Sequence, residues 1–161
     1  MKTHILCLAN SKKYNERCVA GIELKKIAPD SYDIVKFKGK HNWMRPVSHC
    51  EFGEMPENVV GKIKLKDIFE IDVVSKCPQG FQSENVFVNE KSIKIIREAK
   101  FVKKNVEKLI DKEIEFIYGD VNKSVNWLEI KKFNNSLMFI KPEEPKFIKV
   151  SNRFVKDQLR T

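Results

Sequence analysis

The first ninety residues alternate short apolar runs with polar turn sequences, a pattern that is typical of β-structure. Gly21 lies inside one of these runs and predicts a bulge or a sharp bend, a device by which small barrels turn corners. The turn sequence Cys77-Pro78-Gln79-Gly80 separates the last two runs. Strands are expected at residues 3–9, 17–25, 32–37, 65–74 and 84–88.

The second part of the chain begins with a different period. Apolar residues from Ile95 to Ile110 fall at helical spacing, and Ser92 is a candidate N-cap, which predicts a helix over residues 92–112. Further strands are expected at residues 113–118, 125–132, 137–140 and 147–150. The pattern predicts a mainly β fold with one or two helices, and it does not distinguish an OB fold from another small β-barrel.

An extended segment with unusual side chains follows the third predicted strand. Pro46 holds Met44 and Arg45 extended, so Trp43 and Arg45 should project from one face of the chain. An aromatic plane beside a guanidinium suits a base, a sugar or a phosphate. Alternatively, Trp43 anchors the core and Arg45 reaches past it to solvent.

Two polar motifs offer further candidate ligands. Asn10, Ser11 and Lys12 follow a strand end, where they could converge on a phosphate or simply shape the loop. Gln82, Glu84 and Asn85 follow the Cys77–Gly80 turn, where amide and carboxylate groups could read a base edge. They could equally brace the turn, for example through Glu84 paired with Arg17 or Arg45.

These motifs resemble the dual OB domain family of prokaryotic proteins. Three segments occur in the order expected for the family: ANSKK with RCVAG, then WMRPVS, then CPQGFQSEN. A later segment, Ser136–Ile140, looks like one strand of a second unit. The resemblance implies two small OB-like barrels in tandem, at residues 1–90 and 91–161. The second is expected to be either incomplete or divergent, because the chain stops soon after Arg153-Phe154-Val155. The resemblance also implies binding of nucleic acid or a nucleotide, in defence systems directed against mobile elements. The expected binding residues are Asn10, Ser11, Lys12, Arg17, Trp43, Arg45, Ser48, Gln82, Glu84 and Asn85.

The charge is positive and unevenly distributed. The net charge is +9, and residues 91–161 carry 17 Lys and Arg against 10 Asp and Glu, whereas residues 1–90 carry 14 against 12. A basic second half suits a polyanion, with single-stranded nucleic acid as the expected partner. Lysine dominates, however, with 26 Lys and 5 Arg, and scattered lysines also serve simply to solvate exposed faces.

Signatures of catalysis and of metal binding are weak. The cysteines form no CxxC pair, there is no Walker loop and no GxGxxG, and neither a metal nor a cofactor is expected. Ser48 and His49 are adjacent and so point apart, and Cys18 lies among apolar residues as a structural thiol would. The sequence favours a non-enzymatic binding module. The alternatives are a nucleotide-processing enzyme that uses Arg17, Cys18 and Glu84, and a structural subunit that contacts a partner protein.

No membrane segment is expected. No apolar run approaches the roughly 18 residues that a membrane helix needs. The run Ile5–Ala9 is shorter than a signal-peptide core of about 7–15 residues, so a cytoplasmic location is expected.

Overall fold

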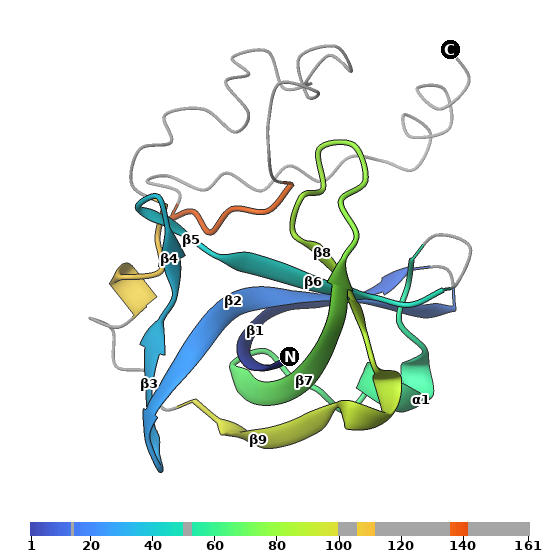
Figure 1. The fold of residues 1–161 in the computed structure, drawn as a ribbon, viewed down its shortest axis with the longest axis horizontal. Helices are drawn as coiled ribbons and strands as arrows, with labels where there is room; N and C mark the ends of the chain where they lie inside the picture. Colours follow the sequence, from blue (N-terminus) through green and yellow to red (C-terminus); the bar gives the residue numbers. More distant parts are fainter. Residues whose placement is uncertain (14, 50–52, 100–105, 112–135, 142–161) are drawn as a thin grey trace, which may run out of the picture.

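The computed structural model describes residues 1–13, 15–49, 53–99, 106–111 and 136–141, and Figure 1 shows their arrangement. The strands are β1 (Lys2–Lys13), β2 (Glu16–Ala28), β3 (Ser31–Ile34), β4 (Lys36–Phe37), β5 (Lys40–His41), β6 (Trp43–Val47), β7 (Asp67–Lys76), β8 (Asn85–Val88) and β9 (Lys94–Glu98). The helices are α1 (Glu57–Val60) and the 3₁₀ turn η1 (Glu90–Ser92). The expected mainly β fold is confirmed.

Five of the strands form a barrel. Their order is β1-β2-β6-β8-β7, and β7 pairs back with β1 to close the path. The β6–β8 pair is parallel and the other pairs of the ring are antiparallel. Five strands in this order, with the short helix α1 between β6 and β7, make the Greek-key barrel of an OB fold.

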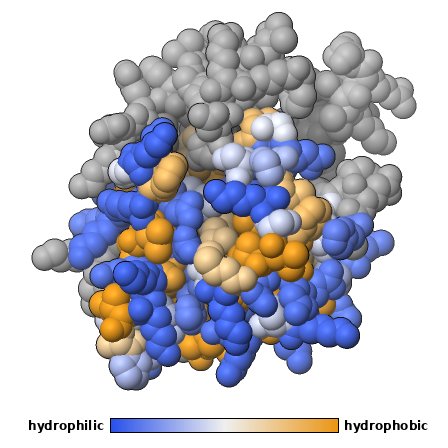
Figure 2. All heavy atoms as spheres, in the orientation of Figure 1, coloured by the Kyte–Doolittle hydropathy of each residue, from blue (hydrophilic) through white to orange (hydrophobic). Residues whose placement is uncertain are grey.

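Side chains alternate between the inside and the outside of the barrel, as the period of a strand requires. Ile5 and Phe69 belong to the cluster that fills the barrel. Their neighbours Leu6 and Ile68 belong to a second cluster on its outer surface. On the face shown in Figure 2, hydrophilic side chains predominate and hydrophobic ones gather in patches between them.

Gly21 allows β1 and β2 to approach closely. It faces Cys7 of β1 and Met44 of β6, and a Cβ atom at this position would lie 1.9 Å from the carbonyl oxygen of Leu6. The register shift of this hairpin lies in β1, between Cys7 and Ala9. The expected bulge is therefore present, but on the strand opposite the glycine.

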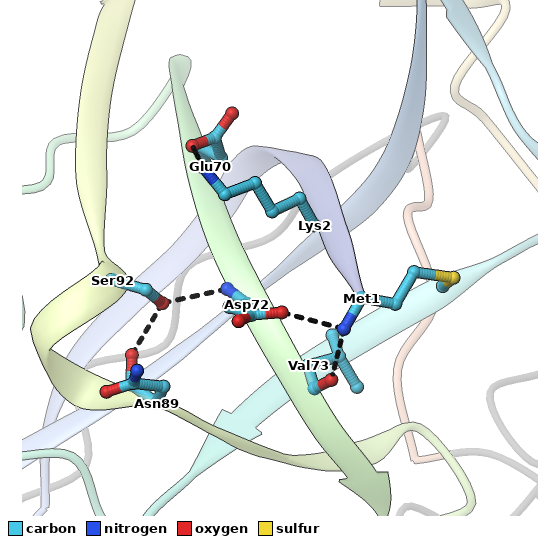
Figure 3. A network of polar contacts seen from close by, with 7 residues as sticks. All are labelled: Met1, Lys2, Glu70, Asp72, Val73, Asn89 and Ser92. Atoms are coloured by element: carbon cyan, nitrogen blue, oxygen red, sulfur yellow. Dashed lines mark hydrogen bonds and ion pairs between the residues drawn. The ribbon is translucent and has the colours of Figure 1, made fainter.

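The seam where the barrel closes carries polar cross-links as well as strand pairing (Figure 3). The backbone N–H of Asp72 in β7 donates to Ser92 Oγ at 2.8 Å, and Ser92 Oγ donates to the carbonyl of Asn89 at 2.6 Å. On the β1 side, Lys2 Nζ lies 3.5 Å from Glu70 Oε1, and the amino group of Met1 contacts Asp72 Oδ1 at 2.7 Å. These contacts join β7 to β1 on one side and to the η1 turn on the other.

Parts of the second half cover the outer apolar cluster. Leu109 is 1% exposed within it, and Leu137 and Phe139 pack against it. Asp111 and Phe139 hold the two segments together, through Asp111 N–Phe139 O at 2.8 Å and Phe139 N–Asp111 Oδ2 at 2.8 Å. Residues 106–111 and 136–141, called the docked segments below, therefore pack against the barrel.

The predicted helix over residues 92–112 is wrong in its first part. Residues 94–98 form β9, which pairs antiparallel with β7, and only residues 106–107 among the described part of that range are α-helical. A free edge of β7 and the β-branched Ile95 and Ile96 favour strand pairing over the helical period. Residues 137–140 are not in a strand, and the expected strands at 113–118, 125–132 and 147–150 lie outside the described residues.

Candidate functional site

A cleft of about 340 Å³ lies on the outer face of the barrel. Its floor comes from β2, β6 and β8, through Cys18, Arg45 and Asn85. The loop between β7 and β8 forms one wall, and residues that follow β6 form another. The volume falls in the range of small-ligand sites, about 300–1,000 Å³.

Two buried polar atoms at this cleft have no hydrogen-bond partner among the described residues. They are Arg45 Nε, a donor, and Asn85 Oδ1, an acceptor. Arg45 and Asn85 are register partners of the parallel β6–β8 pair, and Asn85 is 3% exposed. Buried polar atoms are nearly always satisfied by protein, water or ligand, because an unpaired one costs about 1–3 kcal/mol. Both atoms are inaccessible to water, so they lie within the wall of the cleft, and a molecule in the cleft does not reach either of them in this conformation.

An aromatic pair also lines the cleft. His49 and Phe87 stack with ring centroids 4.6 Å apart and an interplanar angle of 19°. Phe87 is held on β8, whereas His49 follows β6 and is exposed to solvent. The outer ring face of such a pair offers a plane for another flat group.

A buried ion pair sits at the edge of the cleft. Arg45 Nη2 donates to Glu84 Oε1 at 2.8 Å, and the side chains are 13% and 2% exposed. Ser136 of the docked segments completes the network, because its hydroxyl contacts both Arg45 and Glu84 and its N–H donates to Glu84 Oε2 at 3.3 Å. Glu84 compensates the charge of Arg45, so this arginine is not a free cation for phosphate.

The remaining residues of the loop next to β8 brace one another. Asn85 Nδ2 donates to Gln82 Oε1 at 3.2 Å, and the backbone of Gln82 bridges that of Gln79. Ser48 Oγ, which is also at the cleft, donates to the carbonyl of Glu54. Of the ten predicted site residues, the structure therefore brings four to the cleft, namely Arg45, Ser48, Gln82 and Asn85.

The first predicted motif lies elsewhere. Asn10 donates through Nδ2 to the carbonyls of Val60 and Ile63, at 3.3 and 2.7 Å, and so ties the end of α1 to β1. Ser11 and Lys12 are exposed on β1. These contacts fit the interpretation in which the motif shapes the fold.

Arg17 also has a structural partner outside the cleft. Its guanidinium pairs with Glu57 at the start of α1, with Nη2 2.9 Å from Oε1. The hydrogen bond from Arg17 lowers the pKa of Glu57, and attraction from Arg17 and Lys12 adds to the effect. Any stability from this pair is present above the usual pKa of the carboxyl and is lost as the pH falls through the lowered value.

The expectation that Trp43 offers an exposed ring is wrong. Trp43 and Arg45 do share a face, since the docked segments contact both, but Trp43 is 9% exposed in the outer apolar cluster. The surface of this strand is covered by residues more than sixty positions away, which no local pattern reveals. The aromatic groups at the cleft are instead His49 and Phe87, which the motif analysis did not select. The sequence carried one indication that His49 belongs to the site, namely that it directly follows the WMRPVS segment.

The described cysteines should differ in reactivity. Cys7 is fully buried, and burial raises its pKa to about 12, with the charge of Asp67 adding to the shift. Cys18 and Cys77 are partly exposed and line the cleft.

Since the thiolate is the nucleophile, iodoacetamide at neutral pH should alkylate Cys18 and Cys77 in the native protein and spare Cys7. Peptide mass spectrometry measures this, with urea-unfolded protein as control. Native labelling of Cys7 at the rate of Cys18 would contradict the assignment.

The described residues offer neither a metal site nor a membrane-spanning helix. No group of three or more His, Cys, Asp or Glu side chains in that part of the chain is arranged to hold a metal ion. Within the same ranges, no helix has the length and apolar character needed to cross a membrane.

Comparison with known proteins gives one match. No curated protein and no solved structure matches the chain. A family model described as the dual OB-containing domain matches residues 3–161. The barrel order and the parallel β6–β8 pair agree with the OB fold that this description names. The chain belongs to the dual OB-containing domain family.

Proposed function

We propose that this protein is a non-enzymatic binding module whose cleft holds the base of a nucleotide or of a single-stranded nucleic acid. The observation that carries the proposal is the cleft itself, which brings Arg45 and its register partner Asn85 together with the amide side chain of Gln82. Amide and guanidinium groups carry the donors and acceptors that pair with the edge of a nucleobase.

The surroundings of the pair support a base over a phosphate. The stacked rings of His49 and Phe87 offer a plane for a flat heterocycle. Among the described residues of the lining, the one Arg is already paired with Glu84, and Glu54 adds an acidic residue. The cleft also lies on the face that OB folds use for oligonucleotides, beside the loop between the last two strands of the barrel.

The wider setting is proposed from the family resemblance. A nucleotide or a single strand bound by such a module would serve a cytoplasmic prokaryotic defence system, with a partner protein acting on the signal or on the captured strand.

The test is binding of mononucleotides to the purified chain and to His49→Ala. His49 is exposed, so the variant should fold normally, and loss of a stacking ring should weaken binding by about 1–3 kcal/mol. Isothermal calorimetry measures the affinity. Phe37→Ala is the control, because Phe37 is 67% exposed and lies outside the cleft lining, and it should bind mononucleotides as the parent does. If the parent and His49→Ala bind every nucleotide with equal affinity, the base does not stack on His49 in this cleft, and the proposal is contradicted.

An enzymatic alternative has one observation in its favour, since Cys18 and His49 line the same cleft. A thiol with a nearby imidazole can act as a nucleophile with a general base. Incubation with nucleotides followed by chromatography tests this alternative. Turnover that Cys18→Ser abolishes would establish it, and intact nucleotides would favour the binding module.

A purely structural role is favoured by the Arg45–Glu84–Ser136 network, and it predicts no nucleotide binding at all.

A further inference from the structure

The β4–β5 ribbon is a separate small sheet that stands apart from the barrel strands (Figure 1). Its base is anchored. Val35 N donates to Glu23 O at 3.0 Å, Asn42 N donates to Val35 O at 3.1 Å, and Glu23 N donates to Asn42 O at 2.9 Å. The His41 ring adds a contact to the docked segments, with Nε2 3.1 Å from the carbonyl oxygen of Lys108. The ribbon therefore presents its tip from a fixed base.

The tip combines an exposed aromatic ring with several cations. Phe37 is 67% exposed, and Lys36, Lys38 and Lys40 are also exposed. Phe37 is directly opposite Lys40, so both side chains project from one face of the ribbon. Lys38 Nζ lies 5.5 Å from the centre of the Phe37 ring on one of its sides. Lys36 is opposite His41 and so projects from the other face.

The turn holds its lysine in an unfavourable backbone conformation. Lys38 has φ 50° and Gly39 has φ 80°, the left-handed pair that a tight hairpin turn requires. Asn or Gly would adopt the first of these positions more easily, and strained non-glycine residues concentrate at functional sites. A cation is thus presented at the tip of the ribbon, beside the ring.

We propose that Phe37, Lys38 and Lys40 form a second contact site, which binds the sugar-phosphate backbone and one base of a single-stranded nucleic acid. The inference rests on the proposed function and selects a single strand among its ligands. Lysine ammonium groups neutralise phosphates, and the Phe37 ring, which is 67% exposed, can stack on any base. The cleft and the ribbon then have different roles, since the described lining residues of the cleft include no free Lys or Arg for a phosphate, whereas the ribbon supplies lysines.

An anionic membrane is the competing partner for a basic surface with an exposed aromatic ring. Membrane association grows with the apolar area that enters the interface. Phe37 is the one apolar side chain on the tip, with lysines before and after it in the sequence. This small apolar area favours the nucleic acid.

The experiment compares Phe37→Ala, Lys40→Gln and Lys36→Gln with the parent chain. The probes are a fluorescent oligothymidylate of about twelve nucleotides and thymidine monophosphate. Phe37→Ala should weaken oligothymidylate binding by about 5- to 150-fold, the effect of one lost stacking contact. Lys40→Gln should reduce the slope of log affinity against log salt by about 0.7, the value for one lost phosphate contact with a single strand. Lys36→Gln removes the same charge from the opposite face and should leave that slope unchanged.

The outcomes separate this inference from the proposed function. All three variants should bind thymidine monophosphate as the parent does, because the cleft is intact. Parent-like oligothymidylate binding by Phe37→Ala, with mononucleotide binding retained, would overturn the ribbon site and leave the cleft. Absence of binding to either probe by the parent would overturn both. Binding to phosphatidylserine vesicles without binding to the oligonucleotide would assign the ribbon to a membrane and overturn the inference as well.

Discussion

Arg45→Ala should lower the free energy of unfolding by about 3–5 kcal/mol, because it leaves the Glu84 carboxylate buried without its cation. The Glu84 side chain is 2% exposed, so little water is available to compensate for the lost partner in the folded state. Ser136 would remain as a neutral hydrogen-bond donor, which is too weak to hold a buried charge. Urea unfolding followed by circular dichroism measures the loss.

Two variants make this result specific to the buried pair. Arg45→Ala combined with Glu84→Ala removes both charges and should be less destabilised than the sum of the single variants. Arg17→Ala breaks a comparable pair with Glu57 at an exposed position and should lose far less stability. Equal losses for Arg45→Ala and Arg17→Ala would show that burial of the Arg45–Glu84 pair does not decide its contribution.

Trp43→Ala should lower the free energy of unfolding by about 3–5 kcal/mol, since it empties the centre of the outer apolar cluster. The same cavity should loosen the docked segments, because Leu109, Leu137 and Phe139 pack against this cluster. Amide hydrogen exchange should therefore speed up at Asp111 and Phe139, whose amides bond between the two docked segments.

Trp43→Phe is the matched control for this cavity. It keeps an aromatic ring in the cluster, so it should lose much less stability than Trp43→Ala. The amides of Asp111 and Phe139 should also stay better protected from hydrogen exchange. Exchange at Asp111 and Phe139 that stays as slow in Trp43→Ala as in the parent would mean that the docked segments are held in place without this cluster.

The strands could be predicted from the sequence because each buries one face, which imposes a period of two on its apolar residues. β7 was expected at residues 65–74 and spans Asp67–Lys76. The family resemblance then identified the barrel that these strands form. The helix prediction failed at Ile95 and Ile96, where pairing with the edge of β7 outweighs a spacing that also fits a helix.

The site was harder to predict, since it depends on which face of each strand is covered. The common orientation of Trp43 and Arg45 follows from their spacing alone. Whether that face meets solvent depends on Leu109 and Phe139, which are distant in sequence. The sequence indicated that Glu84 could pair with Arg17 or with Arg45, and the structure pairs it with Arg45. No local pattern indicated the stacking of His49 on Phe87, because it joins a loop after β6 to a strand that pairs with β6 in parallel.

The closing pairs of the barrel have a consequence for folding during synthesis. β1 and β2 can form a hairpin early, but β1 obtains its second neighbour only with β7, and β6 obtains its second neighbour only with β8. At ordinary rates of translation, the hairpin waits on the order of several seconds for residues 67–88. Loop-closure entropy opposes these distant pairings until the last strand is present, so the barrel should form late and in one cooperative step. Until then the free edges of β1 and β6 are open to other chains, which makes the nascent protein a natural client for a chaperone.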